Sequence, residues 1–281
     1  MSKKYHWFWV LVFLGFLGCA GQKEQVIRID TRYGEIVAVL FDDTPVHKSN
    51  FIELAEAGRF DSTEFHRVIP EFMVQGGDVF SKEEMPAEEW PTLPAEIRPN
   101  HFHKKGMIAA ARQGNNINPE RRSSGSQFYI VLGQVYDELE LTTDMAKLQA
   151  AFMQYVQLQS QDSLRATYTQ LYEQQDFDSL TRLILSKRDE IEQSLNLKLT
   201  KDLSAEQLEA YTTVGGTPHL DGEYTVFGEV IQGLEVAEKI SLEPRGSRDK
   251  PLDPIYMTIR VEAMTPAQIE REFGYIIEDG K

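Results

Sequence analysis

The segment of residues 65–78, FHRVIPEFMVQGGD, most constrains what this chain can fold into and bind. It is too apolar for a loop, and Pro70 interrupts it too early for a helix, so we expect an extended conformation. Alternation along a strand then puts Phe65 and Arg67 on one face. After Pro70 the chain can return three more residues to the same site: Phe72, Met73 and Gln75. One cation beside an apolar wall suits a bound group that is apolar but carries a nitrogen lone pair, as proline does in a peptide.

Two later groups of residues accompany this segment. They are residues 106–111 with 124–130, which end in SGSQFYI, and residues 218–222 with 224–228, which read PHLDG and YTVFG. Together with FHR, P, FM and QGGD in the first segment, these blocks resemble the ordered signature of the cyclophilin family of peptidyl-prolyl isomerases. The resemblance covers roughly residues 26–133 and 215–264 and does not extend to the region between them.

The resemblance implies a mainly β fold, a closed eight-stranded antiparallel barrel capped by helices, and the sequence between its two parts predicts an inserted α-helical subdomain. It also implies an enzyme, a peptidyl-prolyl cis-trans isomerase that has no cofactor and acts on proline-containing polypeptides. The predicted divisions of the chain are two parts of the barrel domain at 26–133 and 215–264, a helical insertion at 134–214, and a tail helix at 265–281.

Local sequence patterns independently indicate strands at both ends of the barrel domain. Residues 26–31 and 36–41 alternate between apolar and polar side chains around a turn at Gly34, which predicts a β-hairpin. Residues 255–264 alternate in the same way and are predicted to form the last strand. The hydrophobic content of 41% is normal for a folded protein with a sizeable core.

One helix and one long loop are predicted before the second block. Residues 46–57 have apolar side chains near helical spacing, and His47 in this helix is interpreted as a surface residue rather than a ligand. Repeated prolines make residues 81–105 a loop. Three residues there, interpreted as ordinary charged loop residues, are Glu96, His101 and His103. No third histidine at ligand spacing and no paired cysteines accompany them, so no metal site is predicted.

The composition of residues 134–214 differs from the rest, because this region has no proline and no glycine. Apolar residues recur three or four positions apart, which predicts three or four helices forming a helical hairpin or small bundle. Predicted N-caps are Asp162, Asp178 and Ser204, with Gln207 completing a capping box after Ser204. The alternative is a coiled-coil dimerisation arm, which needs a sustained heptad repeat that is not found. We therefore expect a monomer.

The N-terminus has the parts of an export signal: Lys3 and Lys4, an apolar run at residues 7–17, and a Gly-Cys pair. The run is short for a membrane-spanning helix, which needs about 20 apolar residues. Cys19 is the only cysteine, and its surroundings resemble a bacterial lipobox. We predict a lipoprotein signal peptide at residues 1–18, lipidation of Cys19, and a lipid-anchored protein of the bacterial cell envelope, on the periplasmic side or the cell surface. The alternatives are an uncleaved anchor or an ordinary signal with an incidental cysteine.

The charge balance argues against nucleic acid as a partner. The formal net charge is −15, whereas phosphate binding requires clustered Lys and Arg. The one basic run, Arg121 and Arg122 beside Arg112, is local. The expected partners are therefore polypeptides containing proline and, through the lipid on Cys19, a membrane.

The cyclophilin resemblance assigns the chemistry to Arg67. Rotation about an X-Pro bond has a barrier near 20 kcal/mol because the amide is conjugated, and a fixed guanidinium can stabilise the twisted amide by a hydrogen bond to the prolyl nitrogen. Without the resemblance, a buried structural salt bridge would be the first interpretation of Arg67. The implied catalytic residues are Arg67, Phe72 and Gln75, with Gln75 also expected to hold Arg67. The implied substrate-binding residues are Met73, Ala111, Arg112, Gln127, Phe128, Tyr129, Leu220 and Tyr224.

Several residues depart from the family pattern. Arg112 stands where many cyclophilins have asparagine, so a preference for an acidic substrate residue is expected. His219 and Tyr224 stand where the animal enzymes that bind cyclosporin tightly have tryptophan and histidine, so weak cyclosporin binding is expected. A different class of function is a chaperone or scaffold in which the helical insertion holds clients.

Overall fold

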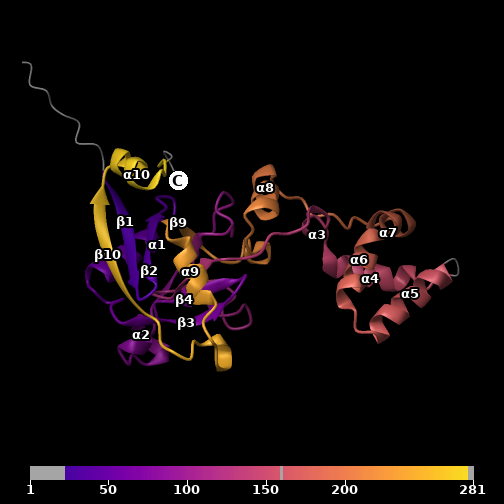
Figure 1. The fold of residues 1–281 in the computed structure, drawn as a ribbon, viewed down its shortest axis with the longest axis horizontal. Helices are drawn as coiled ribbons and strands as arrows, with labels where there is room; N and C mark the ends of the chain where they lie inside the picture. Colours follow the sequence, from indigo (N-terminus) through magenta and orange to yellow (C-terminus); the bar gives the residue numbers. More distant parts are fainter. Residues whose placement is uncertain (1–22, 159–160, 278–281) are drawn as a thin grey trace, which may run out of the picture.

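The computed structural model describes residues 23–158 and 161–277, and its centre is a closed barrel (Figure 1). Each neighbouring pair of barrel strands is antiparallel, in the order β1-β10-β3-β4-β8-β6-β9-β2. The strands are β1 (Glu24–Thr31), β2 (Gly34–Leu40), β3 (Thr63–Ile69), β4 (Met73–Gly76), β6 (Met107–Ala110), β8 (Phe128–Val131), β9 (Val226–Gln232) and β10 (Tyr256–Met264). The predicted eight-stranded antiparallel barrel is confirmed. The predicted signal peptide and Cys19 lie outside the described residues.

The barrel is built around one apolar core, which the alternating patterns supply. The predicted hairpin is confirmed, because β1 pairs with β2 in a register that places Ile27 opposite Ala38, and both are fully buried. Helices α1 (Pro45–Glu56) and α9 (Leu234–Ser241) add their buried faces to the same core. The predicted helix at 46–57 is therefore also confirmed, within one residue at each end.

His47 is not a surface residue, contrary to the interpretation of its helix. Its side chain is 2% exposed, and its Nδ1 lies 2.6 Å from Oε2 of Glu96. The Glu96 carboxylate also accepts hydrogen bonds from the backbone N–H groups of Val46 and His47, which have no partner inside the helix because they lie in its first turn. Glu96, from the segment 81–105, thus caps the N-terminus of α1 with a buried carboxylate, and the same carboxylate binds the His47 ring in the protein interior.

The segment 81–105 contains more structure than a plain loop. It begins with the last two residues of the short helix α2 (Val79–Lys82). It also includes a 3₁₀ turn, η1 (Ala87–Glu89), and β5 (Thr92–Leu93), which pairs with β7 (Ser123–Ser124). Three of its polar side chains are buried rather than solvated: Glu96, His101 and His103. Within the described residues, no group of three His, Cys, Asp or Glu side chains is arranged to hold a metal ion.

Six helices lie between β8 and β9 in the described part of the helical insertion, where the sequence predicted three or four. They are α3 (Glu138–Leu141), α4 (Met145–Tyr155), α5 (Asp162–Glu173), α6 (Phe177–Ser186), α7 (Arg188–Leu195) and α8 (Ala205–Thr213). The prediction missed breaks that use neither proline nor glycine: Gln175 and Asn196 adopt positive φ angles of 58° and 51° instead. Asparagine adopts this conformation more readily than most residues other than glycine, which accounts for the break at Asn196.

The cap residues of the helical insertion were predicted correctly at only one position. The capping box between Ser204 and Gln207 is present at the start of α8. Asp162 and Asp178 instead lie in the first turns of α5 and α6, and Asp176 caps α6 by accepting a hydrogen bond from the backbone of Ser179. Both aspartates still favour a helix start, because negative charge is stabilised near a helix N-terminus.

Helices α4 to α7 share a separate apolar core, centred on Leu148, Phe152 and Ile191. Figure 1 shows them grouped away from the barrel, with α8 lying between them and the barrel. The tail carries helix α10 (Pro266–Phe273), whose Ile269 packs on residues of β1 and β2. In the described ranges, none of the helices combines the length and apolar character that crossing a membrane requires.

Candidate active site

A cavity of about 90 Å³ opens on the outer side of the barrel sheet. It is lined by most of the residues predicted for the site: Arg67, Phe72, Met73, Gln75, Ala111, Arg112, Tyr129, Leu220 and Tyr224. Two predicted residues, Gln127 and Phe128, are not among its lining residues. The structure therefore brings together residues from three distant parts of the chain.

Strand pairing explains how these residues meet. Gln75 on β4 is paired with Arg67 on β3 and with Tyr129 on β8, so the three form a row across neighbouring strands. Leu220 comes from the 3₁₀ turn η3 (Pro218–Leu220), which leads into the last segment before β9. Leu220 and Tyr224 pack against an apolar layer that includes Met73 and Tyr129.

Arg67 and Phe65 do not share a face, contrary to the expectation from alternation. The pairing of β3 with β4 shifts register between these residues, which places a bulge at His66. Phe65 is fully buried in the barrel core, whereas Arg67 lines the outer cavity. An extra residue in one strand re-aims the side chains after it, so the bulge directs the guanidinium outward.

The Arg67 guanidinium is held loosely beside the apolar wall. Its centre lies 6.0 Å from the ring centroid of Phe72, and its Nε lies 3.6 Å from Oδ2 of Asp249. The Arg67 side chain remains 42% exposed, so this is not the buried structural salt bridge that the residue alone would suggest. Sequence reasoning did not anticipate Asp249, which lies far along the chain in a segment without a recognised motif.

Gln75 and Gln127 form a pair at the edge of the cavity. Nε2 of Gln75 donates to Oε1 of Gln127 at 3.0 Å, so the hydrogen bond expected to hold Arg67 is made to Gln127 instead. The backbone of Gln127 accepts from the N–H of Ala111 at 2.9 Å, which keeps the two strands together. The next residue, Phe128, is fully buried in the barrel core, because alternation along β8 sends Phe128 inward and Tyr129 outward.

Arg112 is part of a wall rather than a free cation. Its side chain is 4% exposed, with Nε donating to the Glu223 carbonyl at 2.8 Å and Nη2 to the Glu223 carboxylate at 2.9 Å. Its guanidinium lies 4.5 Å from the ring centroid of Tyr224. The Glu223 carboxylate also pairs with Arg121, at 3.1 Å, so it faces two guanidinium groups, and the preference for an acidic substrate residue stays a prediction.

Comparison with known proteins assigns the chain to a family. The model of the family described as "Cyclophilin type peptidyl-prolyl cis-trans isomerase/CLD" matches residues 26–165 and 200–261. The chain belongs to the cyclophilin family. Its enzyme class is therefore peptidyl-prolyl cis-trans isomerase. The family model leaves residues 166–199 of the helical insertion unmatched.

Two bacterial relatives resemble most of the chain. A "Putative peptidyl-prolyl cis-trans isomerase" of Staphylococcus aureus (strain COL) is 28% identical over 246 residues, which cover 86% of this chain and 93% of that protein. A "Putative bifunctional phosphatase/peptidyl-prolyl cis-trans isomerase" of Streptococcus pyogenes is 28% identical over 243 residues, but the match spans only 38% of its length. A cyclophilin crystal structure from Cryptosporidium parvum aligns with 85% of this chain and 98% of its own, with a TM-score of 0.49 and 20% identity.

The buried side chain of His103 contacts Tyr129 in the cavity wall of this cyclophilin, although the sequence analysis interpreted His103 only as an ordinary loop residue. Nε2 of His103 lies 2.9 Å from the Tyr129 hydroxyl, and Nδ1 of the same ring lies 3.0 Å from Oδ1 of Asp221. Burial raises the pKa of Tyr129 well above its ordinary value, so its hydroxyl stays protonated. His219 stacks on Phe72 with ring centroids 5.6 Å apart, and burial lowers the pKa of His219.

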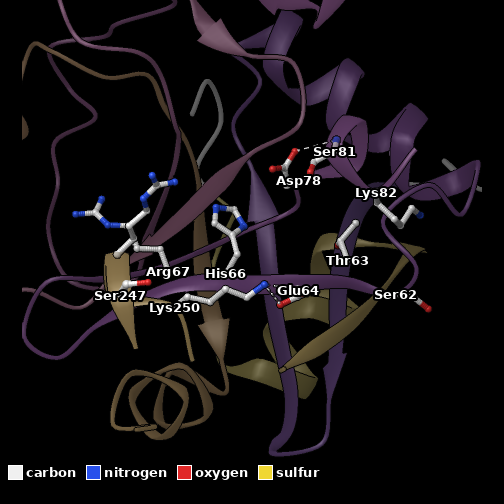
Figure 2. Close-up of a pocket in the computed structure, with 11 residues that line it drawn as sticks. Ser62, Thr63, Glu64, His66, Arg67, Asp78, Ser81, Lys82, Ser247 and Lys250 are labelled. Carbon is white, nitrogen blue, oxygen red and sulfur yellow. Dashed lines mark hydrogen bonds and ion pairs between the residues drawn. The ribbon is translucent and has the colours of Figure 1, made fainter. Parts of the chain in front are cut away.

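Arg67 also lines a second, larger hollow of about 990 Å³ (Figure 2). The walls of this hollow are mainly polar and charged: Ser62, Thr63, Glu64, His66, Arg67, Asp78, Ser81, Lys82, Ser247, Arg248 and Lys250. Figure 2 shows Lys250 paired with Glu64, and Asp78 accepting a hydrogen bond from Ser81. The smaller cavity, with its apolar side chains, is the one suited to a proline ring, and Arg67 stands between the two.

Proposed function

We propose that this cyclophilin accelerates the cis-trans isomerisation of X-Pro bonds in exported polypeptides, with Arg67 as the catalytic residue. The observation that supports the proposal most directly is the position of Arg67, a half-exposed guanidinium beside an apolar cavity of about 90 Å³. A proline ring in that cavity brings its nitrogen within reach of the Arg67 donors. Phe72, Met73, Leu220 and Tyr224 then surround the ring.

The catalytic step consists of stabilising a twisted amide. The cis and trans forms of an X-Pro bond differ by only about 1 kcal/mol, while the barrier between them is near 20 kcal/mol. On twisting, the prolyl nitrogen becomes pyramidal and gains a lone pair that accepts a hydrogen bond. Arginine donates to this lone pair without giving up a proton, because its guanidinium is always charged. The interaction is stronger in the twisted state than in either planar state, which is the condition for lowering the barrier.

The test is an isomerisation assay on an Ala-Pro-containing peptide with the full chain and two variants. Arg67→Ala is expected to lower kcat/KM about 100-fold or more, since one preorganised donor to a transition state contributes that much. Arg67→Lys keeps the charge but loses the planar set of donors, so it too should lose most of the activity. Arg260→Ala is the matched control, because Arg260 lies on β10 and pairs with Asp30, away from the cavity. Unchanged kcat/KM in a folded Arg67→Lys protein would contradict the proposal.

We also propose that the protein is a lipoprotein of the bacterial cell envelope, anchored by a lipid on Cys19. The support is the sequence pattern alone: a basic start, an apolar run, and a Gly-Cys pair after it that holds the single cysteine. Growth of expressing bacteria with labelled fatty acid should label the wild-type protein and not a Cys19→Ser variant. Equal labelling of the two proteins, or none in either, would exclude Cys19 as the anchor.

A chaperone or scaffold function is the second candidate. The observation that favours it is a pair of exposed aromatic side chains on the outer helices, a name we use for α4 to α7. Tyr172 on α5 is 58% exposed and Phe177 on α6 is 56% exposed, with ring centroids 6.4 Å apart. Exposed aromatic surface suits transient binding of unfolded chains. Suppression of client aggregation that survives Arg67→Ala and is lost on removal of these helices would favour this function.

A further inference from the structure

A chain of hydrogen bonds connects the helical insertion to the proposed proline cavity. Asp221 is at its centre. Oδ2 of Asp221 accepts from the Tyr211 hydroxyl at 2.7 Å and from Nε2 of Gln207 at 3.2 Å, and both donors belong to α8. Oδ1 of Asp221 accepts from the backbone N–H of His103 at 2.8 Å and faces its Nδ1 at 3.0 Å. Nε2 of His103 in turn lies 2.9 Å from the hydroxyl of Tyr129, which lines the cavity.

The chemistry of these groups gives each hydrogen bond a direction. An ionised carboxylate only accepts, so Nδ1 of His103 carries the proton that points to Asp221. With Nδ1 as the donor to Asp221, we assign Nε2 as the acceptor of the hydrogen bond from the Tyr129 hydroxyl. Tyr129 is thereby oriented by a bond that points away from the cavity. Tyr211 is fully buried, and burial together with Asp221 raises its pKa, so it remains a donor.

Asp221 is also placed to affect two other walls of the cavity. It directly follows Leu220 and comes three residues before Tyr224, and both of these line the cavity. The backbone N–H of Thr217 donates to the His103 carbonyl at 2.9 Å, which ties the start of this segment to the same histidine. A shift of Asp221 therefore moves Leu220 and Tyr224 directly and Tyr129 through His103.

Helix α8 is fixed to the barrel independently of the outer helices. The N–H of Tyr136 donates to the Tyr211 carbonyl at 3.0 Å, and the Tyr211 ring packs edge-on against Phe102 with centroids 5.5 Å apart. Phe102, Leu141 and Tyr211 form their own buried cluster. Gln207 has a fixed geometry as well, because its side chain completes the capping box with Ser204 while its amide donates to Asp221.

We propose that Tyr211 and Gln207 are positioning residues, which hold Asp221 and, through His103, orient Tyr129 in the wall of the proline cavity. The insertion of helices into this cyclophilin thus shapes its substrate site through α8. The inference rests on the proposed isomerase function for its kinetic consequence. Its structural consequence, the orientation of Tyr129, can be measured without activity.

The test uses the full chain with Tyr211→Phe, Tyr129→Phe and the double variant. Tyr155→Phe is the matched control, because Tyr155 is a buried tyrosine of the same insertion whose hydroxyl bonds to Glu190, in the outer core. Tyr211→Phe is expected to raise KM for an X-Pro peptide about fivefold, with little change in kcat, as for the loss of one hydrogen bond. In the Tyr129→Phe background the same change should have less than about a twofold effect, because the two residues act in one chain.

A spectroscopic measurement separates this inference from the isomerase proposal. In protein labelled with ¹³C at the tyrosine ring carbon that bears the hydroxyl, the Tyr129 resonance, assigned by its loss in Tyr129→Phe, should shift in Tyr211→Phe and not in Tyr155→Phe. Should Tyr211→Phe not fold, Gln207→Glu keeps the capping box but removes the donor to Asp221, and it should shift the same resonance. An unmoved Tyr129 resonance, or equal effects of Tyr211→Phe in both backgrounds, overturns the positioning role. If the Tyr129 resonance shifts in Tyr211→Phe but the wild-type protein has no isomerase activity, the positioning role is supported and only the isomerase function is contradicted.

Discussion

At the scale of single residues, the bulge at His66 decides what Arg67 can do. Without the register shift, Arg67 would follow Phe65 into the barrel core, where an unpaired guanidinium is very costly. With it, Phe65 fills the core and Arg67 reaches the outer surface of the same strand. The catalytic role proposed for Arg67 therefore depends on one extra residue in β3 as well as on the arginine itself.

The buried His47 should contribute to a pH dependence of stability. Burial lowers the pKa of His47, and the Glu96 carboxylate only partly offsets this. Nε2 of His47 is buried and has no hydrogen-bond partner among the described residues, so a second proton there would be unpaired. Because the folded state resists protonation more than the unfolded state, the contribution of His47 is fully present above the unfolded pKa of about 6.5 and is lost as the pH falls below it.

We therefore expect the urea midpoint of unfolding to fall between pH 7.5 and pH 5.5, and His47→Asn to reduce that fall. Asparagine can place its amide donor near the position of Nδ1, so the bond to Glu96 is kept while the titrating ring is removed. The two proteins are compared by urea titration at both values of pH. An identical change of midpoint in the wild type and in His47→Asn would show that His47 does not contribute.

At the scale of elements, the two ends of the helical insertion are held together, because the backbone at residues 133–134 contacts the backbone at residue 216. Gln134 and Gly216 form an isolated antiparallel bridge, with the Gly216 N–H donating to the Gln134 carbonyl at 3.0 Å. Gly133 has a φ of +54°, and a Cβ on it would lie 2.2 Å from the backbone of Gly216. Only glycine fits there, so the two ends of the insertion emerge side by side. Closing the loop at such a point places little demand on the barrel.

Gly133→Ala is expected to lower the free energy of unfolding by about 3 kcal/mol or more. The added methyl group would force the Gly216 backbone to move, and alanine would have to adopt the left-handed conformation of residue 133. Gly222→Ala is the control: Gly222 also has a positive φ, of +72°, but has no atom within 4 Å of the added methyl group. Gly222→Ala should lower the free energy of unfolding by only about 1 kcal/mol, because only its left-handed backbone conformation is unfavourable for alanine. Urea unfolding of the two variants measures the difference, and equal destabilisation would refute the close contact as its cause.

At the scale of the whole molecule, the barrel core and the core of α4 to α7, the two largest apolar clusters of the described residues, are joined through a narrow connection. The barrel core and the core of α4 to α7 share no residue. The connection is antiparallel: Thr143 pairs with Thr200, and the Lys201 N–H donates to the Thr142 carbonyl at 2.7 Å. Helices α3 and α8 lie on the barrel side of this connection and pack with each other against Phe102.

Replacing residues 144–199 by two glycines should therefore leave a folded isomerase, because Thr143 and Thr200 are already paired as in a two-residue hairpin. We expect kcat/KM for a peptide within about twofold of the wild type, as for a change away from the site. Removal of residues 134–214 also deletes Gln207 and Tyr211 and should raise KM. Peptide assays and client aggregation assays on both deletions measure the two candidate functions separately. Loss of peptide activity in the smaller deletion would mean that the outer helices take part in catalysis.

The sequence by itself determined the elements whose signal is local or carried by a motif. Alternation predicted the hairpin of β1 and β2, and the three blocks predicted a barrel and every residue that lines the cavity, from Arg67 to Tyr224. These predictions succeeded because the period of apolar residues and the order of short motifs are properties of the chain itself. The helix boundaries in the insertion were less accessible, since its breaks use polar residues in place of proline and glycine.

Only the tertiary structure decided which polar groups meet. Arg67 and Asp249, or His103 and Asp221, are distant in the chain, and no spacing rule connects them. The interpretation of His47 as a surface residue was wrong for the same reason, because Glu96, which binds its ring, comes from another segment. Burial, pairing and the pKa of a side chain are set by neighbours that folding brings together. A sequence read along its length shows which groups are present, and the folded barrel decides what each one contacts.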